Sequence, residues 1–478
     1  MISNIGIQNN IPQMNGMSNN SAPVQNKAEE SNPQVGSDSV SLGSQKSELG
    51  EFVPGQVIIK TRGSMLAANN DVASKYGATV LDNLQGPGMR AADNSKMLQL
   101  QLPEGMTTEQ ALEQMKADPS IEFAVPNTIY HAEGVQVGQT FTAEQAKNAA
   151  PNDPMFAKQW DMQNVGQDGG TAGCDTHVTQ AWQKTTGLPN GQGPLIAVID
   201  TGVDINHPDL AANIHVNHGE IPNNGIDDDG NGFVDDYNGW NACKQNGDVM
   251  DRQGHGSHVA GTIGAVGNNG IGVSGINQNA TILPVKVFSD NGGADAASII
   301  RGINYAASVG ARLTSNSWGG GPANPAIAEA FRNSDEALHM MSAGNTGTNN
   351  DVHPHYPSDY DLPNNIAVAA TDRNDKLASF SCYGKNNVDI GAPGKDILST
   401  VPGGGYAVYS GTSMATPHVT GAAGLLLAMD PTMSNDELMS RLMNGGDKIA
   451  SLDGKVASGA RLNIEGAMNY DYKGNEVK

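Results

Sequence analysis

Three segments far apart in the chain carry an acid, an imidazole and a hydroxyl in positions suited to acyl transfer. Asp200 ends the apolar run PLIAVID, His255 lies among glycines in GHGSHVAGTIGA, and Ser413 lies between small residues in GTSMATPH. Acyl transfer by serine needs a hydroxyl that attacks, an imidazole that takes and returns its proton, and a carboxylate that orients the imidazole. The three residues therefore predict nucleophilic catalysis at a carbonyl carbon.

The Ser413 segment also has a purely structural interpretation. A Ser or Thr caps a helix, Pro417 fits the first turn, and the apolar run after it belongs in a core. The order of the three residues along the chain separates the known catalytic arrangements. α/β-hydrolases run Ser, Asp, His around G-x-S-x-G, whose second glycine is Ala415 here, and chymotrypsin-like enzymes run His, Asp, Ser.

The order Asp, His, Ser and all three motifs resemble the subtilisin-like serine peptidases, over about residues 150–470. The resemblance implies that Ser413 is the nucleophile, His255 the general base and Asp200 the acid that orients it. It also implies that Asn345, in MMSAGNTG, completes an oxyanion hole with the Ser413 N–H. The second histidine of the motif, His258, is expected to be a buried structural residue.

The segment NSWGGG resembles the part of this family that binds an extended peptide as an added strand. The first specificity pocket is expected between it and a second segment, so the implied substrate-binding residues are Ser317, Trp318, Gly319, Ala343 and Gly344. By the same resemblance the pocket floor falls near HPHYPS. There His355 stands where many relatives have a small residue, so a large apolar side chain is expected to fit poorly.

The segment NNGIDDDGNGFVDDYNGW holds five aspartates in a glycine-rich loop. Its spacing matches positions 1, 3, 5 and 9 of a calcium loop, but position 12 is Asn238 and lacks the bidentate Glu of an EF-hand. Because so many like charges repel one another without a cation, we favour calcium over a solvated acidic loop. The expected ligands are Asp227, Asp229, Asn231 and Asp235, with Asp236 in place of the missing carboxylate.

A second calcium site is implied by the family resemblance alone. The side chains that match its ligands are Asp153, Asp209 and Asn269, and the carbonyl groups are those of Val266, Ile271 and Val273. The sequence therefore predicts two structural calcium sites.

The elements that position these residues predict an α/β fold. From Asn152 onward, nearly all-apolar runs such as TILPVKVF and NIAVAAT alternate with helical segments. This pattern is typical of a mostly parallel sheet covered by helices on both faces. Residues 51–132 read strand-helix-strand-strand-helix-strand, which predicts a small α+β domain of the split βαβ type.

The small domain resembles the inhibitor-like propeptide of the same family. We therefore expect a disordered segment 1–50, a propeptide 51–132, a linker 133–150, a catalytic domain 151–470 and a tail 471–478. The resemblance implies that FAVPNTIYHA lies in the active-site groove, with self-cleavage near Tyr130–Ala132 and a second trimming within 133–150. The alternative is a permanent regulatory domain.

The composition narrows the possible partners. The 27 basic and 50 acidic residues give a net charge of -23, which argues against nucleic acid and anionic membranes. No apolar stretch reaches the ~20 residues of a membrane helix. The three cysteines allow one disulfide, but three ordinary thiols are favoured. Family habit favours a secreted monomer, although no ordinary signal peptide is visible, so the cytoplasm is the alternative.

Two other functions compete with a calcium-stabilised zymogen peptidase acting on polypeptides. A non-catalytic binding module would be free to lose any of the four catalytic residues, and the chain has all of them. An esterase with the same three residues would not need the extended peptide-binding segment NSWGG.

Overall fold

The structure is a computed structural model that describes residues 45–47, 49–62, 69–86, 95–142, 152–188 and 192–474. All of them belong to one contact unit, Ser41–Lys478. Most of the predicted disordered segment lies outside the described residues, as do residues 143–150 of the predicted linker. No helix among the described residues is long and apolar enough to cross a membrane.

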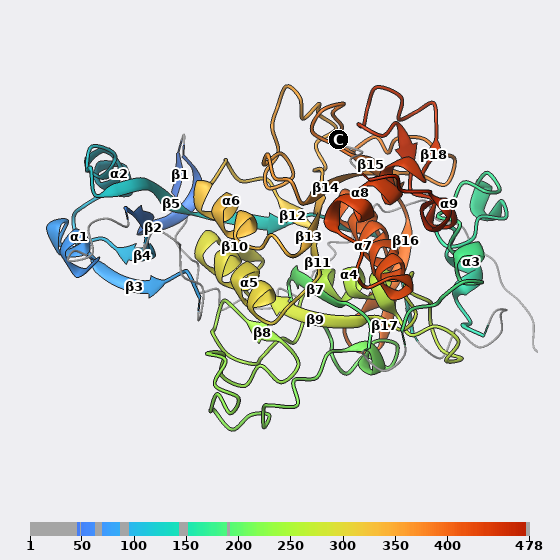
Figure 1. Cartoon of the computed structure of the whole chain (residues 1–478), viewed down its shortest axis with the longest axis horizontal. Helices are drawn as coiled ribbons and strands as arrows, with labels where there is room; N and C mark the ends of the chain where they lie inside the picture. Colours follow the sequence, from blue (N-terminus) through green and yellow to red (C-terminus); the bar gives the residue numbers. More distant parts are fainter. Residues whose placement is uncertain are drawn as a thin grey trace, which may run out of the picture. The chain divides into compact units, whose positions relative to one another are not determined.

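A nine-stranded sheet forms the centre of the larger domain, in the order β18-β19-β15-β14-β13-β11-β7-β9-β8 (Figure 1). Its strands are β7 (Leu195–Asp200), β8 (Trp240–Asn241), β9 (Thr281–Lys286), β11 (Leu313–Asn316), β13 (Leu338–Ser342), β14 (Asn365–Thr371), β15 (Ile390–Pro393), β18 (Asp447–Lys448) and β19 (Ala460–Arg461). Every pairing is parallel except β18 with β19. The predicted α/β class is therefore confirmed.

Helices cover both faces of this sheet, which explains why its strands are apolar throughout. One face packs against α5 (Ala296–Ser308) and α6 (Pro325–Arg332). The other face packs against α3 (Val178–Ala181), α4 (His255–Gly264), α7 (Thr412–Met429), α8 (Asn435–Asn444) and α9 (Ile464–Asn469). In β7, Ile196 and Val198 face the second group, whereas Ala197 and Ile199 face the first. Short 3-10 helices are η2 (Phe156–Lys158), η3 (Gln167–Gly169) and η4 (Ala211–Asn213).

The small domain pairs its strands in the order β5-β2-β4-β3, all antiparallel. The strands and helices are β2 (Gly50–Thr61), α1 (Asn69–Lys75), β3 (Thr79–Asn83), β4 (Met97–Gln101), α2 (Thr108–Lys116) and β5 (Ile121–Ala132). A capping box between Thr107 and Gln110 starts α2, which typically stabilises a helix by about 1 kcal/mol. The predicted element order is confirmed, and Gln45–Ser47 of the predicted disordered segment forms β1, paired with β2.

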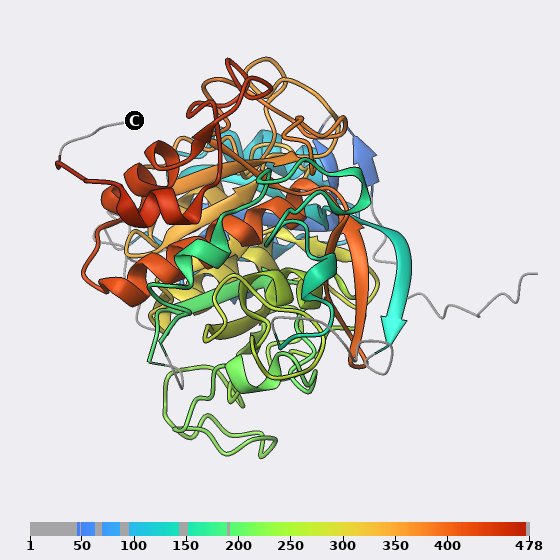
Figure 2. The same cartoon turned by 90° about the vertical axis from the view of Figure 1, so that its right-hand side faces the viewer.

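The chain leaves the small domain along the larger one. The end of β5 pairs antiparallel with β10 (Gly293–Asp295) and β12 (Trp318–Gly319). The following strand β6 (Val135–Thr142) pairs with β17 (Gly405–Ser410), which pairs with β16 (Ile397–Val401). Figure 2 shows β6 in cyan beside these orange strands. Part of the predicted linker is thus a strand, because β17 offers it a free edge.

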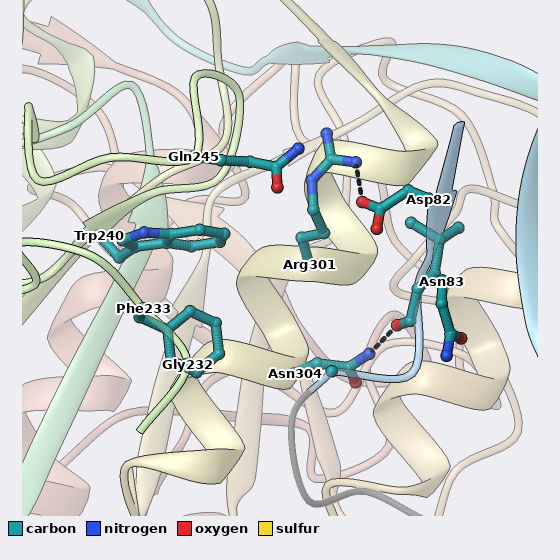
Figure 3. A pocket seen from close by; sticks show the side chains of 10 residues that line it. Asp82, Asn83, Gly232, Phe233, Trp240, Gln245, Arg301 and Asn304 are labelled. Carbon is teal, nitrogen blue, oxygen red and sulfur yellow. Dashed lines mark hydrogen bonds and ion pairs between the residues drawn. The ribbon is translucent and has the colours of Figure 1, made fainter. Parts of the chain in front are cut away.

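Polar contacts from α5 and α6 also join the two domains. Arg301 donates to Asp82 at 2.9 Å and the Asn304 amide donates to the carbonyl of Leu84 at 2.5 Å (Figure 3). Lys60 forms an ion pair with Glu329 at 3.0 Å. A cavity of about 330 Å³ lies beside the Arg301 contact, lined also by Trp240 and Gln245. The small domain therefore packs on the helices that cover the sheet.

Candidate active site

Asp200 and His255 form a buried pair at the carboxyl end of β7 and the first residue of α4. The His255 Nδ1–H donates to Asp200 Oδ1 at 2.8 Å, and the Thr201 N–H donates to the same oxygen at 2.7 Å. Burial alone would lower the pKa of His255, but the charge and hydrogen bond of Asp200 and the backbone of Glu133 raise it above its ordinary value. The arrangement leaves Nε2 as the proton acceptor.

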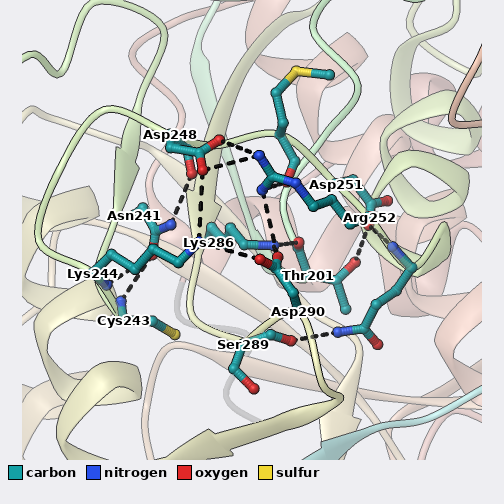
Figure 4. Close-up of polar contacts among 12 residues, drawn as sticks. Thr201, Asn241, Cys243, Lys244, Asp248, Asp251, Arg252, Lys286, Ser289 and Asp290 are labelled. Carbon is teal, nitrogen blue, oxygen red and sulfur yellow. Dashed lines mark hydrogen bonds and ion pairs between the residues drawn. The ribbon is translucent and has the colours of Figure 1, made fainter. Parts of the chain in front are cut away.

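A second carboxylate holds the turn that carries His255. Asp251 Oδ1 accepts hydrogen bonds from the Gly254 N–H and the Thr201 hydroxyl, and its Oδ2 accepts from the N–H and hydroxyl of Ser257. The fully buried Lys286 donates to the Thr201 carbonyl at 2.5 Å and pairs with Asp290 at 3.1 Å (Figure 4). These contacts fix the residues beside Asp200 and His255.

Ser413 lies in the first turn of α7 and is fully buried. Its hydroxyl donates to the carbonyl of Ser317 at 3.1 Å, and the Ser317 hydroxyl donates to the carbonyl of Ser413 at 2.9 Å. The segment after β5 runs between this turn and His255, because a Cβ on Gly134 would lie 3.1 Å from both His255 Nε2 and Met414 Sδ.

Asn345 follows β13 and meets the same turn of α7. Its Oδ1 accepts hydrogen bonds from the N–H and hydroxyl of Thr412 at 2.8 and 3.0 Å. A Cβ on Gly411 would lie 3.4 Å from Asn345 Nδ2 and 3.1 Å from the carbonyl oxygen of Glu133. An amide donor and a backbone carbonyl from the passing segment therefore converge on the start of α7.

The end of β5 lies as a middle strand between two segments of the larger domain. Ala132 is opposite Trp318 on β12, and His131 is opposite both Gly319 on β12 and Gly293 on β10. The next N–H, that of Glu133, donates to the Ser317 carbonyl at 3.2 Å. The Trp318 ring is fully buried with its edge toward Tyr130, at 5.9 Å between centroids.

Ala343 and Gly344 follow β13 and are both buried. Gly344 lies against the imidazole of His355, whose Cδ2 would be 2.8 Å from a Cβ at this glycine. Of the residues expected around a specificity pocket, Gly319 and Gly344 both lie against His355, and the side chain that contacts His355 Nε2 is Glu133, at 2.8 Å. The peptide bond beside His255 is Glu133–Gly134, one residue beyond the predicted cleavage range, because β5 continues to Ala132.

The acidic loop has a different centre from the predicted one. The carboxylates that gather within 4.8 Å are Glu220, Asp229 and Asp236. Glu220 is buried and its Oε2 has no hydrogen-bond partner among the described residues. Asn231 reaches this cluster by donating to Asp236 at 3.1 Å. Glu220 precedes the aspartate run, and spacing within the run contains no signal for it.

Two of the predicted loop ligands bind backbone N–H groups. Asp235 turns to another loop, where its oxygens accept from the N–H groups of Asn224 and Gly225. Asp227 accepts from the N–H groups of Gly230, Asn231 and Gly232. Such side-chain to backbone bonds are the ordinary chemistry of Asp in turns, which a spacing pattern does not distinguish from metal binding.

The second predicted site brings its three side chains together. Asp209 accepts from the Asn269 amide at 2.6 Å and the Val273 N–H at 2.9 Å, and Asp153 accepts from the Asn269 N–H at 3.2 Å. Burial, together with the charge of Asp153, raises the pKa of Asp209 to about 7. Val266 donates its N–H to the Asp209 carbonyl, and the Ile271 N–H bonds Asn269.

The remaining residues singled out by the sequence are structural. Cys174, Cys243 and Cys382 are all free thiols, as favoured. His258 is fully buried, its Nε2 lies 3.0 Å from the Ile397 carbonyl, and burial lowers its pKa to about 3.

Comparisons with known proteins decide the family. Residues 191–459, more than half of the chain, match the Subtilase family model. The chain belongs to the subtilase family. Residues 39–127 match the fervidolysin N-terminal prodomain model, so this subtilase is a subtilisin-type serine protease with a prodomain. The esterase and binding-module alternatives are thereby wrong.

Two curated relatives and one solved structure illustrate the match. Thermitase of Thermoactinomyces vulgaris is 38% identical over 323 residues, which are 67% of this chain and 99% of thermitase. The thermophilic serine proteinase of Bacillus sp. (strain AK1) is 33% identical, over 88% of this chain and 89% of the relative. The crystal structure of fervidolysin from Fervidobacterium pennivorans, at 24% identity and a TM-score of 0.66, covers 88% of this chain and 61% of its own. Its fold matches that of this subtilase.

Proposed function

We propose that this subtilase is an endopeptidase that is made as a zymogen and cuts itself. The observation that carries the proposal is the path of the chain at the end of β5, which lies as a middle strand between β10 and β12 and then passes between His255 and the first turn of α7. A peptide bond held there is in the position of a substrate. Polypeptides are the substrates, and the small domain is an inhibitor within the same chain.

Each catalytic residue takes one role in this proposal. The Ser413 hydroxyl leaves its hydrogen bond to the Ser317 carbonyl and donates to His255 Nε2 instead. It transfers its proton to this nitrogen as Oγ attacks the carbonyl carbon of the substrate peptide bond. Asp200 keeps the imidazole in the tautomer that accepts this proton and stabilises the imidazolium. The Asn345 amide and the Ser413 N–H stabilise the oxyanion, and in subtilisin loss of the corresponding amide costs about 10²–10³ in turnover. His255 then protonates the leaving amine, and water hydrolyses the acyl-enzyme.

We assign the domains as predicted in outline, with 51–132 as the propeptide and 151–470 as the catalytic domain. Substrate binding then uses the segments already in contact with the end of β5, through Ser317, Trp318, Gly319, Ala343 and Gly344. The residues that follow the bond to be cut would bind along β17, because β6 pairs with the edge of that strand.

We further propose that two calcium ions stabilise the catalytic domain. Asp153 and Asp209 are fully buried, and their hydrogen-bond partners in the described part of the chain include no basic side chain. Asn269 and the carbonyls of Val266, Ile271 and Val273 complete that ligand set. In the acidic loop, Glu220 with its unpartnered oxygen would hold an ion together with Asp229 and Asp236. Calcium would supply the positive charge that these carboxylates lack.

A calcium titration tests these two sites. We expect the Tm of the Ser413→Ala chain to rise with calcium, because an ion that binds only the folded state stabilises it by about 2.7 kcal/mol at a hundredfold excess over Kd. Asp209→Asn and Asp236→Asn should each remove part of this rise. A Tm that does not respond to calcium would contradict both sites, and an unchanged rise in one variant would contradict that site.

We also propose that the protein acts outside the cell as a monomer. The cell wall-associated protease of Bacillus subtilis, 37% identical over 65% of this chain, is named for such a location. Recovery of the processed form from the culture medium of the producing cells would support this location, and its retention in the cytoplasm would contradict it.

The intact mass of the full chain and of its Ser413→Ala variant tests the zymogen. We expect the native chain to lose its first ~130 residues during incubation with calcium, while the variant stays whole. If both chains stay whole, self-processing fails as a proposal. If both are cut alike, other proteases are responsible and Ser413 loses its assigned role.

A further inference from the structure

The pocket beside the catalytic turn holds a charged side chain. Glu133 supplies the carbonyl that lies beside Gly411, and its side chain contacts His355 and Ser342, where the first specificity pocket is expected. That side chain is only 14% exposed. A buried carboxylate is costly unless charged or polar partners bind it, so its surroundings indicate whether the pocket is built for it.

Both carboxylate oxygens of Glu133 have partners. Oε1 lies 2.8 Å from His355 Nε2, and Oε2 accepts a hydrogen bond from the Ser342 hydroxyl at 3.1 Å. The His355 side chain is 11% exposed, and Ser342 is fully buried at the end of β13. An imidazole and a hydroxyl thus contact the two oxygens from different elements of the larger domain.

Further contacts hold His355 in place from the side opposite Glu133. Its Nδ1 lies 2.9 Å from the Ser358 hydroxyl, which donates in turn to Asp359 Oδ1 at 2.9 Å. The backbone N–H of His355 donates to the other oxygen of Asp359, also at 2.9 Å. The Ser358 hydroxyl also has the His355 carbonyl as an acceptor at 3.0 Å, so its proton has two acceptors outside the ring. With the proton on either of them, the Ser358 oxygen accepts from Nδ1–H and Nε2–H donates to Glu133. This arrangement accommodates a protonated ring, and although burial opposes protonation, the neighbouring charges of Glu133 and Asp359 raise the pKa of His355.

Two glycines make room for this ring. A Cβ at Gly319 would lie 2.4 Å from His355 Cε1, and one at Gly344 would lie 2.8 Å from Cδ2. Gly344 also has a φ of 103°, which other residues rarely adopt. The walls of the pocket are therefore shaped around the imidazole as well as around the substrate.

We propose that this pocket selects glutamate on the acyl side of the bond to be cut, and that Glu133–Gly134 is the first self-cleavage site. The proposal rests on the endopeptidase function proposed above and adds its substrate class. In the reaction, the Glu133 carbonyl carbon forms an ester with Ser413 Oγ, its bond to the Gly134 nitrogen breaks, and that nitrogen receives the proton from His255. Water then hydrolyses the ester, which frees Ser413 and leaves Glu133 with a new main-chain carboxylate at the end of the released segment.

Other side chains satisfy the pocket less well. Glutamine has the length but no charge for His355, aspartate is one methylene too short to reach both partners, and leucine leaves the buried His355 and Ser342 without a partner. A site built to bind a polar group discriminates strongly against analogues that lack it. Glycine suits the next position, because any Cβ there approaches His255 Nε2 and Met414 Sδ at 3.1 Å.

The test uses peptides that differ only at one residue. The native full chain is first allowed to process itself in calcium. Its kcat/KM is then measured on peptides of the sequence Ile-Tyr-His-Ala-X-Gly-Val-Gln, in which X is Glu, Gln, Asp or Leu. We expect Glu to exceed Gln and Leu by about 10²-fold. Sequencing of the processed chain should give Gly134 as the first N-terminus. Leu or Gln cleaved as well as Glu, by an enzyme that Ser413→Ala inactivates, would overturn the pocket assignment alone.

Two histidine variants assign the selectivity to one side chain. His355→Gln should reduce the Glu/Gln ratio of kcat/KM to within about tenfold of one. His353→Gln changes an exposed histidine two residues earlier and should keep the native ratio. A native ratio in His355→Gln would overturn the proposal. No Ser413-dependent cleavage of any peptide, with the chain folded by its thermal transition, would overturn both the pocket and the endopeptidase function.

Discussion

Two histidines of this subtilase pair with a carboxylate at the same distance, yet the pairs are built differently. His255 Nδ1 and Asp200 Oδ1 are 2.8 Å apart, and both residues belong to the catalytic domain. His355 Nε2 and Glu133 Oε1 are also 2.8 Å apart, but Glu133 belongs to the segment that follows the small domain. The first pair therefore needs no substrate, whereas the second needs the glutamate that the passing segment supplies.

The difference separates catalysis from recognition. Asp200 binds the nitrogen of His255 that faces away from the catalytic turn, so Nε2 is left to move protons. In the pocket, Asp359 and Ser358 bind the far side of His355, so its Nε2 is left to bind the peptide. An imidazole with an acidic group on the side away from the peptide thus serves as a base at His255 and binds an anion at His355.

Breaking the permanent pair should have the largest effect. We expect Asp200→Asn to reduce kcat on the glutamyl peptide by about 10⁴, because the amide favours the wrong tautomer of His255. The Glu/Gln ratio should stay near its native value, since the pocket is untouched. The measurement is kcat/KM on both peptides, and a changed ratio would contradict the separation of the two sites.

Breaking the transient pair from the substrate side should cost less. In the full chain, Glu133→Gln should slow the first cut by about 10²-fold, because a hydrogen bond from a charged to a neutral partner is weaker and the buried His355 loses its counter-charge. The intact mass followed over time gives the rate. Glu104→Gln, a change in an exposed turn of the small domain, is the control and should be cut at the native rate. Equal rates in all three chains would contradict the role of Glu133.

Weakening the support of His355 should cost less again. Ser358→Ala removes the hydroxyl between His355 and Asp359, and we expect the Glu/Gln ratio to fall by about tenfold. Cleavage of the leucyl peptide should change less than the ratio does. An unchanged ratio would show that Ser358 only packs beside the ring.

A change of pH should have the smallest and most gradual effect on the Glu/Gln ratio of kcat/KM. Burial opposes protonation of His355, but the charges of Glu133, Cys382 and Asp359 outweigh it and raise its pKa above the ordinary 6.5 or so. The attraction for glutamate is therefore complete from about pH 5, where glutamate is ionised, and is lost as the pH rises through the raised pKa. The Glu/Gln ratio should fall severalfold per pH unit above that point. A ratio that is flat to pH 10 would contradict an imidazolium in the pocket.

Much of the fold could be predicted because its signals are local. The apolar run before Asp200 predicts a strand buried on both faces, which β7 is. The comparisons and the structure confirm the α/β class and the small α+β domain. The roles of Asp200, His255, Ser413 and Asn345 remain proposals that rest on motif and on their convergence.

The structure adds to the sequence-based expectations where separate parts of the chain meet. Spacing within one loop predicted Asp235 as a ligand, whereas the structure turns it to Asn224 and brings in Glu220 from outside the pattern. The predicted linker contains β6, since only the folded domain shows that β17 has an edge to pair with. No local sequence pattern indicates the direction of the Asp235 side chain or the unpaired edge of β17.

The sequence by itself determined the kind of chemistry, because each catalytic motif carries its reactive side chain and its turn within a few neighbouring residues. Only the tertiary structure decided which side chain the pocket holds. Glu133 and His355 are 222 positions apart, and their contact depends on the register of β5 between β10 and β12. A shift of one residue would present Ala132 or Gly134 to the pocket instead, and register is set by pairing across the folded sheet rather than by local propensity.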